Sequence, residues 1–442
     1  MRISRALLAA LAFHVPLVVH FLARSYIGAV QPGRAELALI VRVDGVLSGA
    51  VYLVCFVYLV LAFAIGRPIP RVTPLARTYL VLSIVAMAYF TGLVVLSPVV
   101  GNTVSYTVGD LYRALLPFIT LVVLFSVFPD DDEFRRRFID TFVVVITAIA
   151  IIGGAFKAYY AAQGIFYGSG LRQYTVGVFL LSYVLLRLTQ KSYSPPVSLL
   201  WSVLLFVLVA LSILSLKRGN WVAIALAIMC VLLLATRRAR AVAFVSCLVL
   251  LAGVGAYKIG LMDLIVARFM YTFSGERGVD SSTFERLAEA AGALATLKAQ
   301  GTPLVYLTGL GHGAEFMADP SFPLSTAGTG SAPGLYHHIH ITPFLLLFRY
   351  GVVGGVLYAL IVLPALATAV RLASRSFRAF AVQHRYGQVY IATLIHVLVT
   401  LVLGMKGNII YGDADFAMVV FILVSAYLIV SEEYRATVEA RV

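Results

Sequence analysis

The sequence predicts an all-α polytopic membrane protein, and three observations carry that prediction. Of its 442 residues, 61% are hydrophobic and only 12% are charged, whereas soluble domains carry about 25% charged residues. The mean hydropathy is +0.96. Apolar runs also recur along the chain, many close to the roughly 20 residues that a helix needs to cross a hydrocarbon core about 30 Å thick.

We expect about 12 transmembrane helices from these runs. Their expected positions are 6–23, 46–66, 78–100, 112–128, 138–156, 174–189, 197–216, 221–236, 241–258, 344–369, 388–404 and 414–431. The first run follows the basic stretch MRISR, and no A-x-A cleavage site followed by a polar mature start is evident. It is therefore expected to be a retained first helix and not a signal peptide.

The distribution of basic residues predicts the orientation of these helices. With a cytoplasmic N-terminus, the cytoplasmic side receives 19 of the 34 Lys and Arg residues and the opposite short loops receive eight. Because basic residues near helix ends stay on the cytoplasmic side, both chain ends are expected inside. A basic cytoplasmic face also accounts for the net charge of +14, so no nucleic acid is expected as a partner.

A long polar segment divides the chain into three regions. Residues 1–258 hold helices 1–9, residues 259–340 form an outer loop, and residues 341–442 hold helices 10–12. Within the loop, SSTFERLAEAAGALATLKAQ has a Ser/Thr cap and apolar residues near the helical period, at Leu287, Ala291, Leu294 and Leu297. We expect an amphipathic helix whose apolar face lies on the membrane or on other helices.

The stretch YHHIHITP places three histidines, His337, His338 and His340, immediately before the tenth apolar run. Three interpretations remain open: interfacial hydrogen bonding, a metal site built on HHxH, and proton transfer. Zinc sites usually add Cys or carboxylate ligands, whereas a neutral imidazole with a pKa of about 6.5 suits a general base. Glu315 and Asp319 are carboxylates that could assist such a base.

Two cations, Lys217 and Arg218, occupy the tight turn LKRGN on the outer side, against the charge trend. Such a pair suits an anion such as phosphate, although surface anchoring is the alternative. By contrast, Arg113 and Arg172 are expected to be boundary residues whose side chains reach the membrane surface.

The stretch GLGHG, which follows the expected loop helix, is rich in glycine. Gly309, Gly311 and Gly313 are expected to form a turn that requires positive φ, with close approach to a substrate as the alternative. His312 lies between them and is expected to be an exposed loop residue, with contact to an acceptor as the alternative.

The cysteines and the lack of nucleotide-binding motifs disfavour two further classes of protein. Cys55, Cys230 and Cys247 all fall within apolar runs and have no ligand spacing, so neither a disulfide framework nor a metal site is expected. The chain has no Walker or GxGxxG nucleotide motif. An ATP-driven pump is therefore disfavoured.

Three stretches together resemble the O-antigen ligase-like superfamily, which contains O-antigen ligases and Wzy-type O-antigen polymerases. LSLKRGNWVAIALAI resembles its Arg-Gly turn between two helices, and FERLAEAAGALATL with TPLVYLTGLGHGAEF resembles its extracytoplasmic segment. HITPFLLLFRYGVVGG is similar to its ligase signature, with the expected spacing from His340 to Gly351 and Gly354. Ile341 departs from that signature, which favours Asn, Ser or Gln there.

The resemblance implies a glycosyltransferase of the bacterial inner membrane whose active site faces the periplasm. The donor would be a glycan on undecaprenyl diphosphate, and the acceptor a hydroxyl of lipid A core (ligase) or of a second lipid-linked glycan (polymerase). Carried over by position, Arg218 and Arg286 would bind the diphosphate with Lys217 as an auxiliary cation. His340 would be the base, with His338 and His337 as alternatives. No metal or nucleotide cofactor would be needed, because the polyprenyl diphosphate is itself the leaving group. Membrane lipids would be the remaining partners.

Two choices stay open at this point. Within the family, the His–Gly–Gly spacing favours a ligase and Ile341 favours a polymerase. In a different class, a transporter or flippase of twelve helices is expected to show repeated halves with broken helices in matching positions, and neither is evident in the sequence. Its charges are also expected at mid-membrane, whereas those of this chain map to the outer side.

Overall fold

The computed structural model describes most of the chain as helix. The described residues are 5–19, 21–22, 34–65, 73–127, 131–162, 173–190, 194–214, 218–235, 237–258, 260, 263, 266, 281–317, 334–404 and 414–440. The first ten helices are α1 (Arg5–Phe13), α3 (Arg34–Ala64), α4 (Pro74–Gly92), α5 (Leu96–Val99), α6 (Val104–Val127), α7 (Asp132–Ala162), α8 (Gln173–Gln190), α9 (Pro195–Leu214), α10 (Arg218–Leu234) and α11 (Arg238–Lys258). They are followed by α13 (Ser281–Gln300), α14 (Pro303–Thr308), strands β1 (Phe316–Met317) and β2 (Leu335–Tyr336), α15 (Thr342–Ala367), α16 (Arg375–Gln383), α17 (Arg385–Gly404) and α18 (Ala414–Glu439).

The all-α, multi-pass character expected from the sequence is confirmed. Six helical stretches within the described residues are long and apolar enough to cross a membrane: Pro74–Val99, Val104–Ser126, Asp132–Ala155, Thr342–Ala373, Arg385–Leu403 and Asp415–Glu439. Shorter apolar helices cover the other expected runs. A total of 12 crossings therefore stays a prediction.

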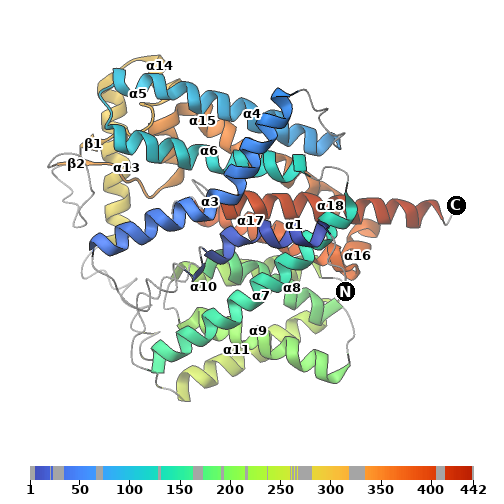
Figure 1. The fold of residues 1–442 in the computed structure, drawn as a ribbon. Coiled ribbons are helices and arrows are strands. Elements are labelled where there is room, and N and C mark those ends of the chain that lie inside the picture. The colour runs from blue at the N-terminus through green and yellow to red at the C-terminus, as the bar shows by residue number, and fades with distance from the viewer. Residues whose placement is uncertain are drawn as a thin grey trace.

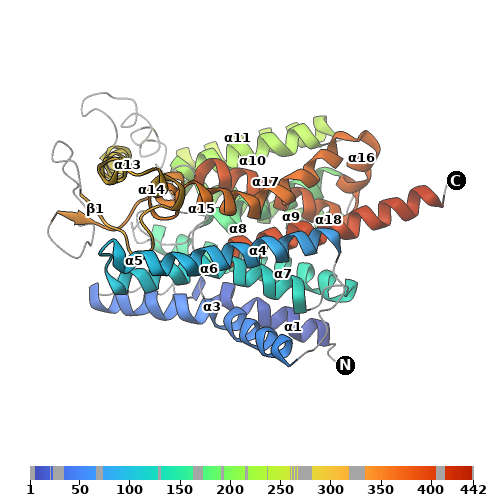
Figure 2. The same ribbon diagram turned by 90° about the horizontal axis from the view of Figure 1, so that it is seen from above.

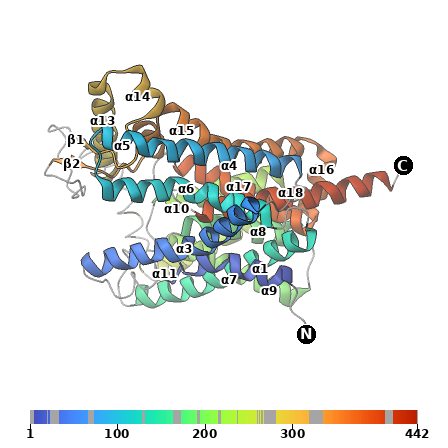
Figure 3. The same ribbon diagram turned by 45° about the horizontal axis from the view of Figure 1, so that its top comes forward.

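Most helices run side by side along one direction, and α13 lies across one end of them (Figures 1 and 2). The short helices α14 and α5 and the strands β1 and β2 gather around α13 at that end (Figure 3). The C-terminal half of α18 and helix α16 lie at the opposite end (Figure 1). The described part of the segment between α11 and α15, which holds α13, α14, β1 and β2, thus lies at one end of the bundle.

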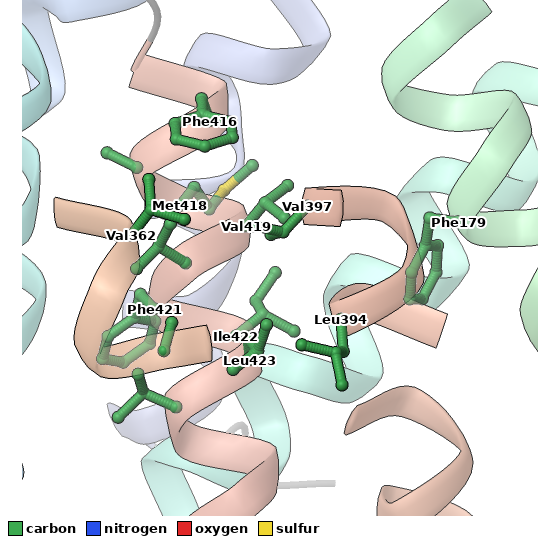
Figure 4. Packing of buried hydrophobic residues seen from close by; sticks show 14 of the residues in the cluster. Phe179, Val362, Leu394, Val397, Phe416, Met418, Val419, Phe421, Ile422 and Leu423 are labelled. Atoms are coloured by element: carbon green, nitrogen blue, oxygen red, sulfur yellow. The ribbon is translucent and has the colours of Figure 1, made fainter. Parts of the chain in front are cut away.

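The core of the bundle includes α15, α17 and α18 and the faces of α6 and α7 that pack against α18. Phe421 of α18 lies beside Val362 of α15, and Leu423 on the other side of α18 lies toward Leu394 of α17 (Figure 4). The ring centroid of Phe421 is 5.0 Å from that of Phe125 and 5.1 Å from that of Phe138. Because lipid is as apolar as these side chains, close packing and not exclusion from water stabilises such contacts.

The loop helix α13 is present where the sequence predicts it, but its expected apolar face is partly wrong. Leu287 is 54% exposed and Ala291 is exposed, whereas Ala293 is buried. Strand β1 packs so closely on α13 that a Cβ at Gly292 would lie 2.6 Å from the carbonyl oxygen of Met317. The small side chains of α13 therefore face the protein, because only they allow this approach.

Helix α15 is broken at Gly351, which has φ 61° and ψ −168°. The break frees backbone carbonyls, and the glycine turn occupies them: Leu310 N donates to Phe348 O and Gly311 N donates to Arg349 O, each at 2.9 Å. The sequence showed no such break. Transporters use broken helices to expose carbonyls to ions, but these two carbonyls already accept backbone hydrogen bonds.

The break and the glycine turn fit together because both lack side chains. A Cβ at Gly351 would lie 2.2 Å from the carbonyl oxygen of Leu307, and one at Gly309 would lie 2.3 Å from the carbonyl carbon of Arg349. Real Cβ atoms do not approach backbone this closely. Helix α15 and the turn after α14 are therefore held in a single arrangement.

Two glycine substitutions in α15 are expected to have opposite effects. Gly351→Ala places a side chain at positive φ, which costs about 1–2 kcal/mol, and adds a clash, so the protein should unfold at a lower temperature. Gly355→Ala meets nothing within 4 Å and replaces a helical glycine, so its stability should be unchanged or raised by up to about 1 kcal/mol. Thermal unfolding of the purified proteins in detergent checks this, and equal melting temperatures would contradict it.

Candidate functional site

The histidine segment after β2 is extended and not helical, because α15 begins only at Thr342. In an extended chain successive side chains point to opposite sides. His337 and Ile339 are buried, while His338 is exposed and His340 is partly exposed. The rings of His338 and His340 lie with their centroids 4.4 Å apart. The expectation that His337 and His340 would share a helical face is therefore wrong.

His340 is held by a carboxylate from the loop helix. Both oxygens of Glu289 lie 2.9 Å from its Nδ1, and Oε2 also accepts a hydrogen bond from its backbone N at 2.9 Å. The Glu289 side chain is only 7% exposed, whereas the His340 side chain is 42% exposed. A carboxylate at Nδ1 favours the tautomer that carries its hydrogen there, which leaves the Nε2 lone pair to accept a proton.

A second, fully buried network lies beneath this pair. Asp110 of α6 accepts a hydrogen bond from Arg349 Nη1 at 2.6 Å and another from Gly313 N at 2.9 Å. Arg349 Nη2 donates to the carbonyl oxygen of His337 at 2.5 Å and lies 3.0 Å from its Nε2. The His337 ring stacks on Tyr106, with centroids 4.1 Å apart.

The buried network is structural and positioning in character. Asp110 and Arg349 are each only 1% exposed, and both lie in apolar helical stretches. Charges in such surroundings are tolerated only when they are paired and hydrogen-bonded. Since the same guanidinium also binds the carbonyl oxygen of His337, the network fixes the start of the segment that carries His338 and His340.

His338 lies among positive charges. It keeps an exposed edge, yet burial of the rest of the ring is the main cause that lowers its pKa to about 4. The positive charges of His340, Arg349 and Arg113 act in the same direction. His338 is therefore neutral at pH 7, and its nitrogen is a weaker base than an ordinary imidazole.

Two arginines lie one helical turn from acidic residues of this cluster. Arg286 precedes Glu289 by three residues on α13, and Arg113 follows Asp110 by three residues on α6. Side chains three apart on a helix share a face and are about 5–6 Å apart at Cβ. Arg113 is exposed and Arg286 partly exposed, and the effect of Arg113 on His338 shows that it lies near the histidines.

The glycine turn confirms the expected positive φ, which is 72° at Gly309, 81° at Gly311 and 77° at Gly313. His312 is fully buried, so the expectation of an exposed loop histidine is wrong. Its Nε2 lies 2.8 Å from the carbonyl oxygen of Phe90, and burial lowers its pKa. His312 therefore fastens the turn to α4.

Several predicted residues lie outside what the structure describes. Lys217, Arg172 and Asp319 are outside the described residues, and Arg218 is described only as the first backbone position of α10. The convergence of Arg218 and Arg286 on one anion therefore stays a prediction.

The other carboxylates show no metal-binding arrangement. Glu315 Oε2 accepts a hydrogen bond from Thr103 Oγ1 at 3.2 Å, which holds it against the start of α6. Within the described ranges, no three His, Cys, Asp or Glu side chains are grouped to hold a metal ion.

Three residues of the site escaped the sequence analysis: Asp110, Glu289 and Arg349. Asp110 and Arg349 carried a usable signal, because an ionisable residue beside or within an apolar run marks a site by default. Glu289 carried none, since Glu is common in helices such as AEAAGALATL. Only its contact with His340, 51 residues later, distinguishes it.

Breaking the buried ion pair is expected to destabilise the protein strongly. Asp110→Asn leaves the Arg349 charge buried without its carboxylate, which costs about 3–5 kcal/mol. The matched control is Asp140→Asn, which removes a pair with Arg385 whose side chains are 30% and 53% exposed and so costs at most about 1 kcal/mol. Chemical denaturation in detergent measures both, and equal losses would show that the buried pair is not a structural constraint.

Comparison with known proteins assigns no family to this chain. No family model matches it, and no curated protein matches it. A fold of apolar helices is shared by proteins with many functions. A function for this chain is therefore inferred from its own residues and their geometry.

Proposed function

We propose that this protein is a membrane glycosyltransferase that moves a glycan from undecaprenyl diphosphate to an acceptor hydroxyl. The reaction takes place at the periplasmic face of a bacterial inner membrane, without metal, and inverts the anomeric carbon. The primary assignment is an O-antigen ligase that acts on lipid A core. The single observation that carries the proposal is the half-exposed His340 held by the buried Glu289, beside arginines and at the end of apolar helices.

The reaction needs a base on the acceptor side. The acceptor oxygen attacks the anomeric carbon from the face opposite the diphosphate, and its proton passes to Nε2 of His340. The bond between the anomeric carbon and the phosphate oxygen breaks, and its electron pair leaves with undecaprenyl diphosphate. Glu289 keeps Nδ1 protonated and stabilises the imidazolium that forms, as carboxylates do in other carboxylate–histidine pairs.

The reaction also needs fixed positive charge at the leaving group. Negative charge grows on the diphosphate as the bond breaks, so cations placed there stabilise the transition state more than the ground state. Arg218 and Arg286 are assigned to the diphosphate, and Lys217 is an auxiliary cation. Arg286 lies one turn from Glu289 on α13, which supports its assignment to the same site as His340.

The geometry supports His340 over its two neighbours as the base. The ring of His337 is buried against Tyr106, so an acceptor cannot reach it without displacing that contact. His338 is exposed, but its pKa of about 4 makes it a weak base. His340 combines a carboxylate partner with exposure to solvent.

A Wzy-type polymerase is the second candidate, since it uses the same donor and differs only in its acceptor. Ile341 favours it, because this residue departs from the ligase signature. The structure gives Ile341 an extended conformation at the start of α15, with no side-chain hydrogen bond to the helix. An Asn, Ser or Gln there would have a polar group to offer, and Ile has none.

Substitution of His340 or of its partner Glu289 is expected to lower the rate of glycan transfer without loss of donor binding. His340→Ala should reduce the rate by about 10²–10⁴-fold, while His338→Ala and His337→Ala should cost less. Glu289→Gln should lower kcat with little change in KM, because it removes the charge that stabilises the imidazolium. Transfer is measured with purified protein and lipid-linked glycan. Exposed Glu432, on α18, supplies the control variant Glu432→Gln, and full activity of all three histidine variants would refute the proton-transfer role.

The diphosphate assignment predicts a different kinetic pattern. Arg218→Ala and Arg286→Ala should each remove most of the activity, and Arg286→Lys should also be impaired, since lysine offers a point charge in place of a planar fork. Arg375→Ala, an exposed arginine at the opposite end of the bundle, is the matched control. Full activity of the Arg218 and Arg286 variants would refute the assignment.

Deletion of the gene in its native host separates the two candidates. Loss of all O-chain from lipopolysaccharide, with lipid-linked polymer intact, identifies a ligase. A single repeat unit on the core identifies a polymerase. Gel analysis of lipopolysaccharide gives both readouts, and a normal lipopolysaccharide pattern would contradict the proposed function.

A further inference from the structure

An uncharged segment connects α13 to β1. Residues 299–314, AQGTPLVYLTGLGHGA, contain no Asp, Glu, Lys or Arg, whereas Lys298 and Glu315 flank them directly. The segment comprises the end of α13, helix α14 and the glycine turn. An apolar stretch of roughly 10–14 residues is too short to cross a bilayer and is typical of a buried, re-entrant or interfacial segment. Burial and depth distinguish these three cases.

Helix α14 is not buried in the protein. None of its side chains is buried, and Leu304 and Leu307 are 61% and 49% exposed. Tyr306 is exposed as well. The helix is nevertheless held firmly, since a Cβ at Gly351 of α15 would lie 2.2 Å from the carbonyl oxygen of Leu307. A fixed group of exposed apolar side chains marks a surface that meets another apolar partner.

Helix α4 shows how deep this segment lies. The hydroxyl of Tyr89 is 3.5 Å from the carbonyl oxygen of Thr308, and Nε2 of His312 is 2.8 Å from the carbonyl oxygen of Phe90. Phe90 lies nine residues before the end of the candidate span Pro74–Val99. Because about 20 residues cross the hydrocarbon core, this span of 26 residues extends past the core by about three residues at each end. Phe90 therefore lies about 9 Å below the edge of the core at 1.5 Å per residue.

The backbone of the glycine turn is paired, as this depth requires. The amides of Leu310 and Gly311 donate to the carbonyls before the break in α15. The carbonyl oxygens of Leu310 and His312 accept hydrogen bonds from Asn102 Nδ2 at 2.8 and 2.9 Å. Irregular backbone at membrane depth is tolerated only where such partners replace water. The turn therefore meets the main requirement for a position inside the bilayer.

The exposed surface of α14 adjoins that of α15. After the break, Val352 and Val356 of α15 are 50% and 52% exposed. Both belong to the stretch Thr342–Ala373, which is long and apolar enough to cross a membrane, so in a bilayer they face lipid. Helices α14 and α15 pack against each other (Figure 2). Leu307 lies against Gly351, the residue before Val352, so α14 continues a lipid-facing surface.

We propose that residues 303–313 form a re-entrant segment, in which the exposed face of α14 lies in the hydrocarbon of one leaflet and the glycine turn leads the chain back toward the surface. The partner of this face is the acyl chains of membrane lipids. The inference goes beyond the proposed function, because it concerns only the depth of the chain in the bilayer. Each exposed leucine of α14 is then removed from water, which stabilises the inserted position.

Tryptophan substitution tests the depth of α14 in the full chain, reconstituted into bilayers. Leu304→Trp and Leu307→Trp each replace an exposed side chain, so the fold should be kept. Emission is compared between phosphatidylcholine with ordinary acyl chains and phosphatidylcholine with brominated ones, since bromine quenches an indole that it contacts. The emission of the two native tryptophans is measured in the parent protein and subtracted.

Two further variants serve as controls. Val356→Trp on α15 is the lipid-facing control, because its exposed side chain lies within a candidate span. Ala436→Trp is the water-facing control, because Ala436 is exposed, follows the charged Arg435 and lies on the part of α18 that projects beyond the bundle (Figure 1).

Both α14 variants should lose as large a fraction of their emission in brominated lipid as Val356→Trp loses, and Ala436→Trp should lose none. Emission of the α14 variants that bromine leaves unchanged would overturn the proposal. In that case a maximum at the wavelength of Ala436→Trp would show that α14 lies in water, and a blue-shifted maximum would show that protein, such as a second copy of the chain, covers it. Glycan transfer is measured separately, so either result leaves the proposed function standing.

Discussion

The ion pair between Asp110 and Arg349 is the constraint on which the functional end of the molecule depends. The two residues are 239 positions apart in the sequence, and both side chains are buried within apolar helices. Neither charge is tolerable there alone, so α6 and α15 must lie at one relative position. The remaining hydrogen-bonding capacity of the pair holds Gly313 N and the carbonyl oxygen of His337. One buried contact thus sets the glycine turn and the histidine segment together.

The break in α15 fixes the position of the glycine turn relative to this helix. At Gly351 the helix gives up regular backbone bonding, and the amides of Leu310 and Gly311 occupy the carbonyls just before the break. Tyr89 of α4 donates its hydroxyl to the next carbonyl, that of Tyr350, at 2.8 Å. In an apolar environment a free carbonyl is costly, so the turn after α14 has little freedom to move away. Backbone of α15 and of the turn after α14, together with Tyr89 of α4, therefore holds this end of the protein in one arrangement.

The polar side chains of this end divide by exposure into two groups with different roles. The buried side chains form hydrogen bonds with one another or with the backbone; they are Asp110, Arg349, His337 and His312. His338 and Arg113 are exposed, and His340 and Arg286 are partly exposed. Glu289 joins the two groups, because it is buried yet its carboxylate holds an exposed ring. Helix α15 begins directly after the histidine segment, and an apolar groove of about 430 Å³ lies along one of its faces.

The sequence by itself determined the class and most of the helices. Long apolar runs must be helical in a bilayer, because only a helix satisfies its own backbone groups there, so the predicted positions agree with the observed helices. The helical period of SSTFERLAEAAGALATLKAQ predicted the position of α13, although not which of its residues are buried. The spacing of YHHIHITP marked the histidines as candidates. All of these signals are local, involving residues within a few turns of one another.

Tertiary structure alone decided which of these residues meet. The Glu289 carboxylate that binds His340 lies 51 residues before it in the chain. The buried ring of His312 forms a hydrogen bond through Nε2 to the carbonyl oxygen of Phe90, which lies 222 residues earlier. The face of α13 that packs depends on strand β1, and the break in α15 depends on backbone from the glycine turn. Such contacts depend on distances across packed helices, which neither hydrophobic periodicity nor helix propensity encodes.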